Sequence, residues 1–454
     1  MIVMKFGGTS VESAEALDRV AGVVKSRLDQ KPLVVVSAMG KTTDGLVEMA
    51  RAAAAGDLPA ALAELRKIAE HHHREGLASA RDNRRAGLEA LLSGTFARIE
   101  KRLRDLPVGD LSPADNDVLL SYGERLSSAV VAEAFFRKGL PVVCFDSRTV
   151  IKTDANHGAA QLLRDETAAA LIAHVAPLLD DSVVVMGGFI ASTLDDVTTT
   201  FGRGGSDYSA SIIGALLGAD EVQIWTDVDG VMTADPSLVA DAYRLKVMSF
   251  GEASELAYFG ARVLHPATMA PALEKNIPIR VANSRHPDNE GTLIVAEVSH
   301  TALVKSIAYK EGITIVDVRS TRMLMAHGFL ARLFNVFDRF ETAVDMVTTS
   351  EVSVSLTVDR TDRLDEIIAE LEGVADVERR DNNAIVCVVG DGIRNTPGVS
   401  AKIFTALDGI LIEMISVGAS RMNVSLVVDE NDLKEVVQRL HKTFFTQVDK
   451  EVFA

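Results

Sequence analysis

Short apolar runs alternate with longer amphipathic segments through the first two-thirds of the chain. The runs are rich in β-branched residues and apolar on both faces, which is typical of strands buried in a parallel sheet. They lie at residues 2–6, 33–37, 141–145, 183–187, 222–225 and 279–282. Helical patterns cover residues 13–29, 44–55, 84–105, 113–138, 159–175, 207–218 and 262–275. This alternation predicts a three-layer α/β/α sandwich, with ligands bound in the loops that follow the strands.

The last third of the chain contains an internal repeat. GFLARLF at 328–334 matches GVSAKIF at 398–404, and SVSLTVD at 353–359 matches NVSLVVD at 423–429, both at an offset of 70 residues. Each copy reads as a strand, a loop with glycine, a helix, two strands and a second helix. The sequence therefore predicts a first domain over 1–298 and a repeat region over 299–454. The copies are expected at about 312–385 and 386–454, with interleaving left open.

Charge and composition exclude several classes of protein. The chain has 47 Lys+Arg and 64 Asp+Glu, a net charge of −17, so we expect no binding to nucleic acid or to anionic membranes. Its 2 cysteines cannot form a disulfide framework or a zinc cluster, and no residues are predicted to form a resident metal site. The amino terminus lacks the features of a signal peptide, and no apolar run is long enough to span a membrane. These observations predict a cytoplasmic protein.

A turn rich in glycine follows the first predicted strand. Lys5 ends the strand, and Gly7, Gly8 and Thr9 lead into a helix. Glycines allow the backbone to approach a ligand closely, and a helix amino terminus favours an anion. The spacing matches neither a Walker A loop nor a dinucleotide fingerprint. From these residues alone, a tight turn explains the pattern as well as a phosphate site does.

A second such turn opens the predicted helix at 207–218. Arg203, Gly204, Gly205, Ser206 and Asp207 follow one another there. An arginine can bind a carboxylate or a phosphate through two parallel hydrogen bonds. A plain turn would explain the glycines but not the flanking arginine and aspartate, so the pattern favours a functional site.

Three further segments carry weaker signals. Thr226 and Asp227 follow an apolar strand at an edge where a nucleotide would lie, and the run Asp-x-Asp-Gly does not have the spacing of an EF-hand. A simple turn stays open there. Ser37 and Thr43 flank the loop after the second strand, where their hydroxyls could hold a carboxylate. Glu124, within a long helix, could hold an ammonium group or belong to a solvated face.

Taken together, these motifs resemble the aspartate kinase family. The matching segments are KFGGTSV at 5–11, VVVSAMGKTTD at 34–44, SYGERLSS at 121–128, GRGGSD at 202–207, WTDVDGVMTADP at 225–236 and FGARVLHP at 259–266. The repeat resembles paired ACT domains. The resemblance implies an α/β fold of the amino-acid kinase type, followed by two ferredoxin-like (βαββαβ) ACT domains. No homoserine dehydrogenase portion follows residue 454, so a monofunctional enzyme is expected.

The resemblance also implies a reaction, in which ATP with Mg²⁺ phosphorylates the side-chain carboxylate of L-aspartate. The product, 4-phospho-L-aspartate, begins lysine, threonine and methionine synthesis. Lys5 and Asp207 are then catalytic, Arg203 binds the α-carboxylate of aspartate and Glu124 its ammonium group. The implied aspartate site comprises Ser37, Thr43, Glu124, Arg203, Gly204, Gly205 and Ser206. The implied nucleotide site comprises Lys5, Gly7, Gly8, Thr9, Thr226, Asp227, Met232, Ser237, Arg262 and Val263, of which Met232, Ser237 and Arg262 depart from common family residues.

Paired ACT domains in this family bind an end-product amino acid, and lysine is the first expectation, with threonine or no effector left open. The implied effector residues are Met323, Gly328, Phe329, Leu330, Asp345 and Ser350. Asp345 would hold an ammonium group or lie in a solvated turn. A homodimer through the repeats is expected, and a tetramer stays open. Two other functions are alternatives: a different amino-acid or carbamate kinase, and an amino-acid sensor with an inactive kinase domain. The sensor predicts loss of Lys5, Arg203 or Asp207, and all three are present.

Overall fold

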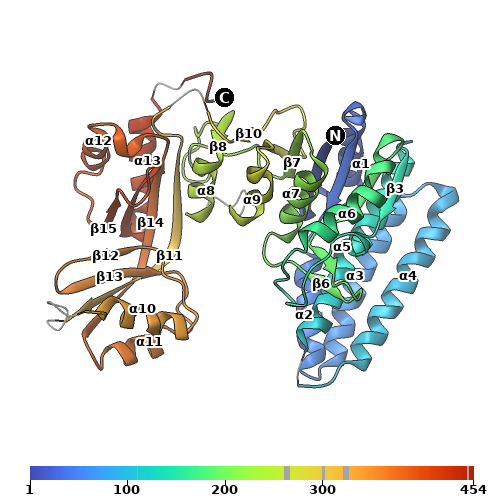
Figure 1. The fold of residues 1–454 in the computed structure, drawn as a ribbon, viewed down its shortest axis with the longest axis horizontal. Helices are drawn as coiled ribbons and strands as arrows, with labels where there is room; N and C mark the ends of the chain where they lie inside the picture. The colour runs from blue at the N-terminus through green and yellow to red at the C-terminus, as the bar shows by residue number, and fades with distance from the viewer. Residues whose placement is uncertain (110, 260–265, 299–301, 321–326, 447–448) are drawn as a thin grey trace. The chain divides into compact units, whose positions relative to one another are not determined.

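The computed structural model describes residues 1–109, 111–259, 266–298, 302–320, 327–446 and 449–454. The chain divides into two compact units, one drawn from residues 1–231 and 263–296 and the other from 232–262 and 297–454 (Figure 1). Across the described residues, none of the helices is both long and apolar enough to cross a bilayer. The predicted domain limits at 298 and near 385 stay predictions.

A twisted sheet forms the centre of the first unit. Its strands follow the order β3 (Val142–Phe145), β4 (Val183–Gly187), β2 (Pro32–Val36), β1 (Ile2–Phe6), β7 (Glu221–Thr226), β9 (Ile279–Asn283) and β10 (Thr292–Val295). The first six strands pair in parallel, whereas β10 runs antiparallel to β9. Every residue of β1, β2 and β4 is buried. This burial confirms the prediction drawn from strands that are apolar on both faces.

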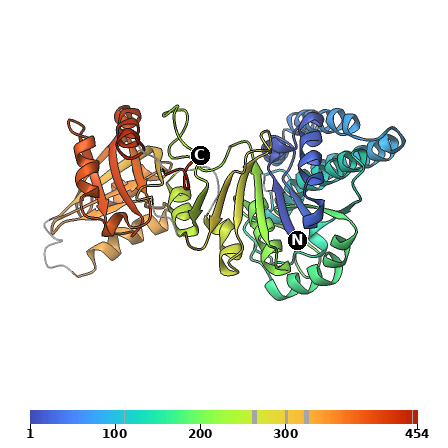
Figure 2. The ribbon, with the colours of Figure 1, turned by 90° about the horizontal axis from the view of Figure 1, so that it is seen from above.

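Helices cover both faces of this sheet (Figure 2). The helices of the first unit are α1 (Ala14–Lys25), α2 (Thr42–Ala54), α3 (Leu58–Ser79), α4 (Asp82–Asp105), α5 (Pro113–Arg137), α6 (Arg164–His174), α7 (Gly205–Leu217) and α9 (Pro266–Glu274). Met4 and Val34 share one core with α1 to α5, whereas Val3, on the opposite face of β1, lies beside Gly214 of α7. These layers confirm the predicted three-layer sandwich. Helix α3 was absent from the predicted helices.

Local sequence explains where two of these helices begin. Ser13 precedes α1 and accepts a hydrogen bond from the Ala16 amide. Ser112 does the same for α5, where Pro113 occupies the first helical position. Serine side chains satisfy amides that have no partner within the helix, and proline has no amide to satisfy.

A small hairpin leaves the central sheet after β4. It consists of β5 (Ile190–Ser192) and β6 (Thr198–Thr200), which pair antiparallel. The chain then turns through residues 201–204 into α7. The hairpin therefore carries the glycine-rich turn that contains Arg203.

The second unit contains one antiparallel sheet. Its order is β12 (Val347–Thr349), β13 (Ser353–Val358), β11 (Ser306–Arg319), β14 (Asp376–Val389), β16 (Asn423–Asp429) and β15 (Ile412–Val417). Helices α10 (Phe329–Arg339), α11 (Leu364–Leu371), α12 (Val399–Ala406) and α13 (Leu433–Phe444) accompany it, and the unit also includes β8 (Val247–Ser249) and α8 (Phe250–Tyr258). Figure 1 shows α10 beside α11 and α12 beside α13. Strand β14 begins and ends 70 residues after β11, so the sequence repeat corresponds to a structural repeat.

The two copies share their long central strands. The carboxyl-terminal part of β11 pairs with β13 on one side and with the first part of β14 on the other. The second part of β14 pairs with β16 and with the first part of β11. The pairing shifts register between Lys310 and Ile315. Each copy therefore completes its four-stranded sheet with half of a strand from the other copy.

Candidate active site

A cavity of about 470 Å³ lies in the first unit, beside the carboxyl ends of β1, β2 and β4. The lining residues are Lys5, Ser37, Thr43, Asn116, Leu120, Glu124, Gly158, Phe189, Thr200, Phe201, Gly202, Arg203, Gly204, Gly205, Ser206 and Asp207. All residues predicted for catalysis and for aspartate binding are among them. They come from segments that are as far apart in the sequence as the first strand and α7, yet they surround one space.

A buried ion pair lies at one end of this cavity. Nζ of Lys5, on β1, is 2.7 Å from Oδ1 of Asp207, and both side chains are largely buried. Asp207 lies in the first turn of α7, where the helix dipole favours a negative charge. Gly204 begins that helix with a φ of 74°, which glycine adopts without strain. The glycine turn therefore brings a carboxylate directly to the lysine.

The first glycine-rich turn connects three strand ends. The Gly7 amide donates to the Trp225 carbonyl at 3.0 Å, and the Gly40 amide donates to the Gly8 carbonyl at 3.0 Å. A Cβ atom on Gly8 would lie only 2.8 Å from the Gly40 carbonyl oxygen, so no larger residue fits there. Thr9 follows in the short 3₁₀ helix Gly8–Ser10. The contacts of Gly7, Gly8 and Thr9 with a nucleotide stay predictions.

Glu124 is a buried carboxyl group in the wall of the cavity. Its Oε1 accepts a hydrogen bond from the Ala38 amide at 3.2 Å, while Oε2 has no hydrogen-bond partner among the described residues. Burial raises the pKa of Glu124 to about 8, against the opposing effects of the Ala38 hydrogen bond and the charge of Lys5. Glu124 therefore does not belong to a solvated face, and a cation in the cavity would favour its ionised form.

Arg203 lies on the rim of the cavity and is exposed. Over the described parts of the chain, no carboxylate pairs with its guanidinium group. A second cavity of about 380 Å³ shares Phe201, Gly202, Arg203 and Gly205 with the first. In that second cavity, Arg164 pairs with Glu274 at 2.8 Å. Of these two arginines, Arg203 is the one whose guanidinium is open to an anionic ligand.

Sequence reasoning missed several residues of the cavity wall, namely Asn116, Leu120, Gly158, Phe189 and Thr200. Residues 116, 120 and 124 follow a four-residue spacing on α5, so the helical face of Glu124 was a usable signal. Phe189 follows β4, one of the strand ends where ligands are expected. Gly158 and Thr200 come from a loop and a short polar strand, which carry no such signal.

The predicted nucleotide residues are divided between the two units. Thr226 ends β7, and its hydroxyl donates to the exposed Asp227 carboxylate at 3.2 Å. In the second unit, the Met232 carbonyl accepts from Ser306 at 2.7 Å, and the Ser237 amide donates to Asp235 at 2.8 Å. Arg262 and Val263 lie outside the described residues. Their common nucleotide site stays a prediction.

The predicted effector residues lie in the first repeat copy. Gly328, with a φ of 78°, precedes α10, whose first residue Phe329 is buried and whose second residue Leu330 is exposed. Ser350 follows β12, and its hydroxyl lies 2.6 Å from that of Ser353. Met323 lies outside the described residues.

Asp345 already has a cationic partner. Nζ of Lys310 lies 2.9 and 3.0 Å from its two carboxylate oxygens and 2.8 Å from Asp359. Burial raises the pKa of Asp345, and the hydrogen bonds from Lys310 oppose this shift. The Asp345 side chain is 7% exposed, so it is not part of a solvated turn.

Comparison with known proteins agrees with this architecture. The model of the amino acid kinase family matches residues 1–283, and an ACT domain model matches residues 386–444. Lysine-sensitive aspartokinase 3 of Escherichia coli is 36% identical over 98% of this chain and 99% of its own length. Aspartokinase 2, chloroplastic, of Arabidopsis thaliana is 36% identical over 98% of this chain and 84% of its own length.

Solved structures show the same similarity. E. coli aspartokinase III in complex with lysine and aspartate matches with a TM-score of 0.85 and 35% identity, over 98% of this chain and 99% of that one. The same enzyme in complex with aspartate and ADP matches with a TM-score of 0.83 and 35% identity, over 98% and 100%. Three observations lead to one conclusion. They are a cavity lined by a lysine, a glutamate and an arginine on an amino-acid kinase fold, a repeated ACT sheet, and similarity over nearly the whole length. The chain belongs to the aspartokinase family, the kinases that phosphorylate a carboxyl group.

Proposed function

We propose that this chain transfers the terminal phosphoryl group of ATP to the side-chain carboxylate of L-aspartate, giving 4-phospho-L-aspartate. The observation that carries the proposal is the single cavity lined by Lys5, Glu124, Arg203 and Asp207. The related E. coli enzyme, solved with aspartate and with ADP, supports the same pair of substrates.

The charges of the cavity suit an amino acid as acceptor. Arg203 binds the α-carboxylate through its planar fork of donors. Glu124 binds the ammonium group through Oε2, which has no hydrogen-bond partner in the part of the chain that the structure describes. The side-chain carboxylate then points toward Lys5. Lys5 stabilises the negative charge of the transferring phosphoryl group, and Asp207 holds the lysine ammonium group in place.

The donor set also suits Mg²⁺ delivered with ATP. Mg²⁺ is commonly held by one or two carboxylates together with substrate phosphates. Asp207 supplies a carboxylate at the cavity, and the described residues contain no cluster of three or more metal-ligating side chains. Bound Mg²⁺ would shield the charge of the phosphates during transfer.

Release of ADP should depend on L-aspartate. We expect steady ADP formation when ATP, Mg²⁺ and aspartate are supplied to the full chain, measured with a coupled assay. Glutamate is the control, because its extra methylene moves the acceptor carboxylate away from Lys5. Equal turnover of glutamate would favour a different amino-acid kinase, and no turnover of either would favour the amino-acid sensor.

The affinity for aspartate should rise with pH. Because the pKa of Glu124 is about 8 in the cavity, most of this carboxyl group is protonated at neutral pH and cannot pair with an ammonium group. The KM for aspartate should therefore fall as pH rises toward 8, by up to about tenfold per pH unit. Kinetics from pH 6 to pH 9 measure the effect.

Glu124→Gln should give a high KM for aspartate that no longer changes with pH over this range. Glu133→Gln is the control, since Glu133 lies on the same helix and pairs with Arg84. A pH dependence that survives in Glu124→Gln would contradict the assignment.

In the folded state Glu124 binds a proton that the unfolded chain releases above about pH 4.5. Its contribution to the free energy of unfolding is therefore present below that pH and lost as pH rises through about 8.

We also propose that lysine inhibits the enzyme through the repeat region, which forms a homodimer. The E. coli relative is lysine-sensitive by name and was solved with lysine bound. An effector ammonium group would have to share or displace Lys310 at Asp345, so binding at this carboxylate involves competition with a side chain of the protein itself.

Millimolar lysine should lower activity, and Ser350→Ala should weaken the inhibition. Lys310→Met removes the cationic partner of the Asp345 carboxylate and should shift inhibition to lower lysine concentrations, measured as the half-inhibitory concentration. Lys246→Met is the control, since Lys246 lies in the same unit and its ammonium group donates to the Lys450 carbonyl. Inhibition by threonine alone would refute lysine as the effector, and an unchanged lysine response in Lys310→Met would remove Asp345 from its site.

A further inference from the structure

The short strand β6 is held by its threonine hydroxyls. All three side chains are buried, and each hydroxyl bonds to a different segment of the first unit. The pairs are Thr198 with Arg148 at 3.0 Å, Thr199 with Thr153 at 2.7 Å, and Thr200 with Asp117. The turn that contains Arg203 directly follows this strand. The contacts that anchor the strand therefore determine the position of that turn.

Asp117 is a buried carboxylate that does not line the cavity. It is 0% exposed and accepts three hydrogen bonds, from the Thr200 hydroxyl, from Nδ1 of His157 at 2.7 Å and from the Gly158 amide at 3.1 Å. Burying a carboxylate is unfavourable unless donors replace its water. Here three donors from two separate segments meet at one side chain.

Both of those segments form walls of the aspartate cavity. Gly158 and Thr200 line it, and the Ala160 amide donates to the Thr200 carbonyl at 3.2 Å. Asp117 lies two helical turns before Glu124 on α5, so both carboxylates lie on the same side of that helix. One rigid helix therefore carries Glu124 and also holds the loop and the strand that precede Arg203.

We infer that Asp117 is a positioning residue for the acceptor amino acid. It holds the loop at His157 and Gly158 against β6, and thereby keeps the Arg203 turn at a constant distance from Glu124. Asp117 touches no substrate and acts through Thr200 and Gly158. This inference rests on the proposed function, because it assigns Arg203 and Glu124 to the two ends of one amino-acid backbone.

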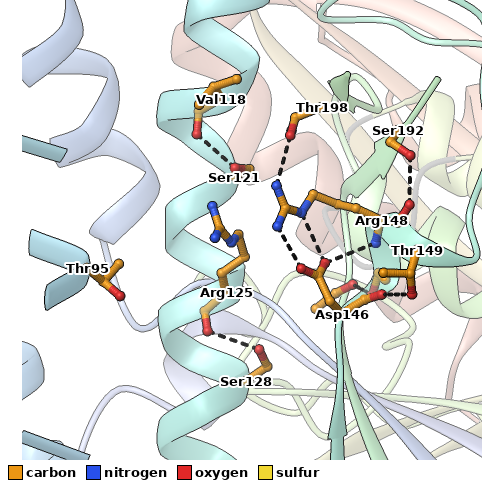
Figure 3. Close-up of polar contacts among 12 residues, drawn as sticks. Thr95, Val118, Ser121, Arg125, Ser128, Asp146, Arg148, Thr149, Ser192 and Thr198 are labelled. Carbon is orange, nitrogen blue, oxygen red and sulfur yellow. Dashed lines mark hydrogen bonds and ion pairs between the residues drawn. The ribbon is translucent and has the colours of Figure 1, made fainter. Parts of the chain in front are cut away.

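The other end of β6 is anchored independently. Figure 3 shows Arg148 paired with Asp146 while it also donates to the Thr198 hydroxyl. The Arg148 guanidinium and the Asp146 carboxylate are 2.6 Å apart. The Arg148 carbonyl accepts from Ser192 of β5 at 2.7 Å. Loss of the Asp117 contacts should therefore release the end of the hairpin at the cavity and leave the rest in place.

The test is Asp117→Asn in the full chain. The amide keeps the size of the carboxylate but offers one acceptor oxygen instead of two. We expect the KM for aspartate to rise about tenfold or more, while kcat and the KM for ATP change less than about twofold. Asp115→Asn is the matched control, because Asp115 lies on the same helix and accepts hydrogen bonds from Ser112 and Arg102 away from the cavity.

Variants of the strand separate positioning from stability. Thr200→Val should raise the KM for aspartate, and Thr200→Ser, which retains the hydroxyl, should restore it. Thr199→Val removes a buried hydroxyl of the same strand that bonds to Thr153, and it should leave the KM for aspartate unchanged. An equal loss of kcat and melting temperature in Thr199→Val and Asp117→Asn, without a selective rise in the KM for aspartate, would overturn the inference.

Hydrogen exchange gives a readout that does not need activity. Amides of residues 154–161 should exchange faster in Asp117→Asn than in Asp115→Asn or in the unchanged chain. If the unchanged chain does not turn over aspartate, the proposed function fails. The role of Asp117 in positioning the groups that bind the acceptor amino acid then fails with it. If it turns over aspartate and Asp117→Asn keeps the same KM and the same exchange rates, only the positioning role fails.

Discussion

Lys5→Met is expected to lower kcat by about a hundredfold to a thousandfold, the loss typical when one preorganised donor to the developing negative charge is removed. The reason is the location of this ammonium group, buried at the end of β1 and 2.7 Å from Asp207. In such a site a positive charge acts on the transferring phosphoryl group with little screening by water. Steady-state kinetics with ATP and aspartate measure the loss.

Lys31→Met is the matched control for this prediction. Lys31 pairs with Asp180 at the same distance of 2.7 Å, but both side chains are more than half exposed. An exposed ion pair contributes little, so activity should change by less than about twofold. A similar loss of kcat in both variants would show that the effect of Lys5 comes from folding and not from the site. A Lys5→Met enzyme with nearly full kcat would refute the catalytic role.

Arg203→Ala is expected to raise the KM for aspartate about a hundredfold, because it removes two charge-assisted hydrogen bonds to the α-carboxylate. The guanidinium is exposed on the rim of the cavity, so its removal leaves no buried charge without a partner. Lost binding energy should therefore appear mainly in KM and less in kcat. Arg203→Lys keeps the charge but not the fork geometry and should be intermediate.

Arg164→Ala controls for a general effect of arginine at this surface. Arg164 lines the neighbouring cavity and is paired with Glu274 at 2.8 Å, so it should leave the KM for aspartate within about twofold. An unchanged KM in Arg203→Ala would remove the assignment of the α-carboxylate to this residue. A fall in kcat without a rise in KM would instead place Arg203 near the transferring phosphoryl group.

Much of the fold was predictable because its helices and strands follow from the spacing of apolar and polar residues over short stretches of sequence. The predicted strand at 2–6 coincides with β1, and the predicted helix at 113–138 differs from α5 by one residue at its carboxyl end. Helix α3 was missed because its buried face ends in His72, Gly76 and Ser79, which weakens the apolar periodicity. The hairpin β5–β6 was missed because β6 consists of three threonines whose burial depends on partners elsewhere.

The candidate site was predictable to the same extent. Glycine turns at strand ends point to Lys5 and Arg203, since parallel strands present their carboxyl ends along one edge of a sheet. The raised pKa of Glu124 could not be read from the sequence, because it follows from burial against segments far from α5. The pairing of Asp345 with Lys310 was equally hidden, because it joins β11 to the loop that precedes β12.

By itself, the sequence determined the alternating strands and helices, the repeat offset and the residue types that serve the reaction. Such features depend on neighbours within a few residues, where periodicity and backbone preference are sufficient. The tertiary structure decided which side chains meet. Asp117 and Thr200 are 83 residues apart and hydrogen-bonded to each other, and such a contact forms only when the sheet and its helices pack together.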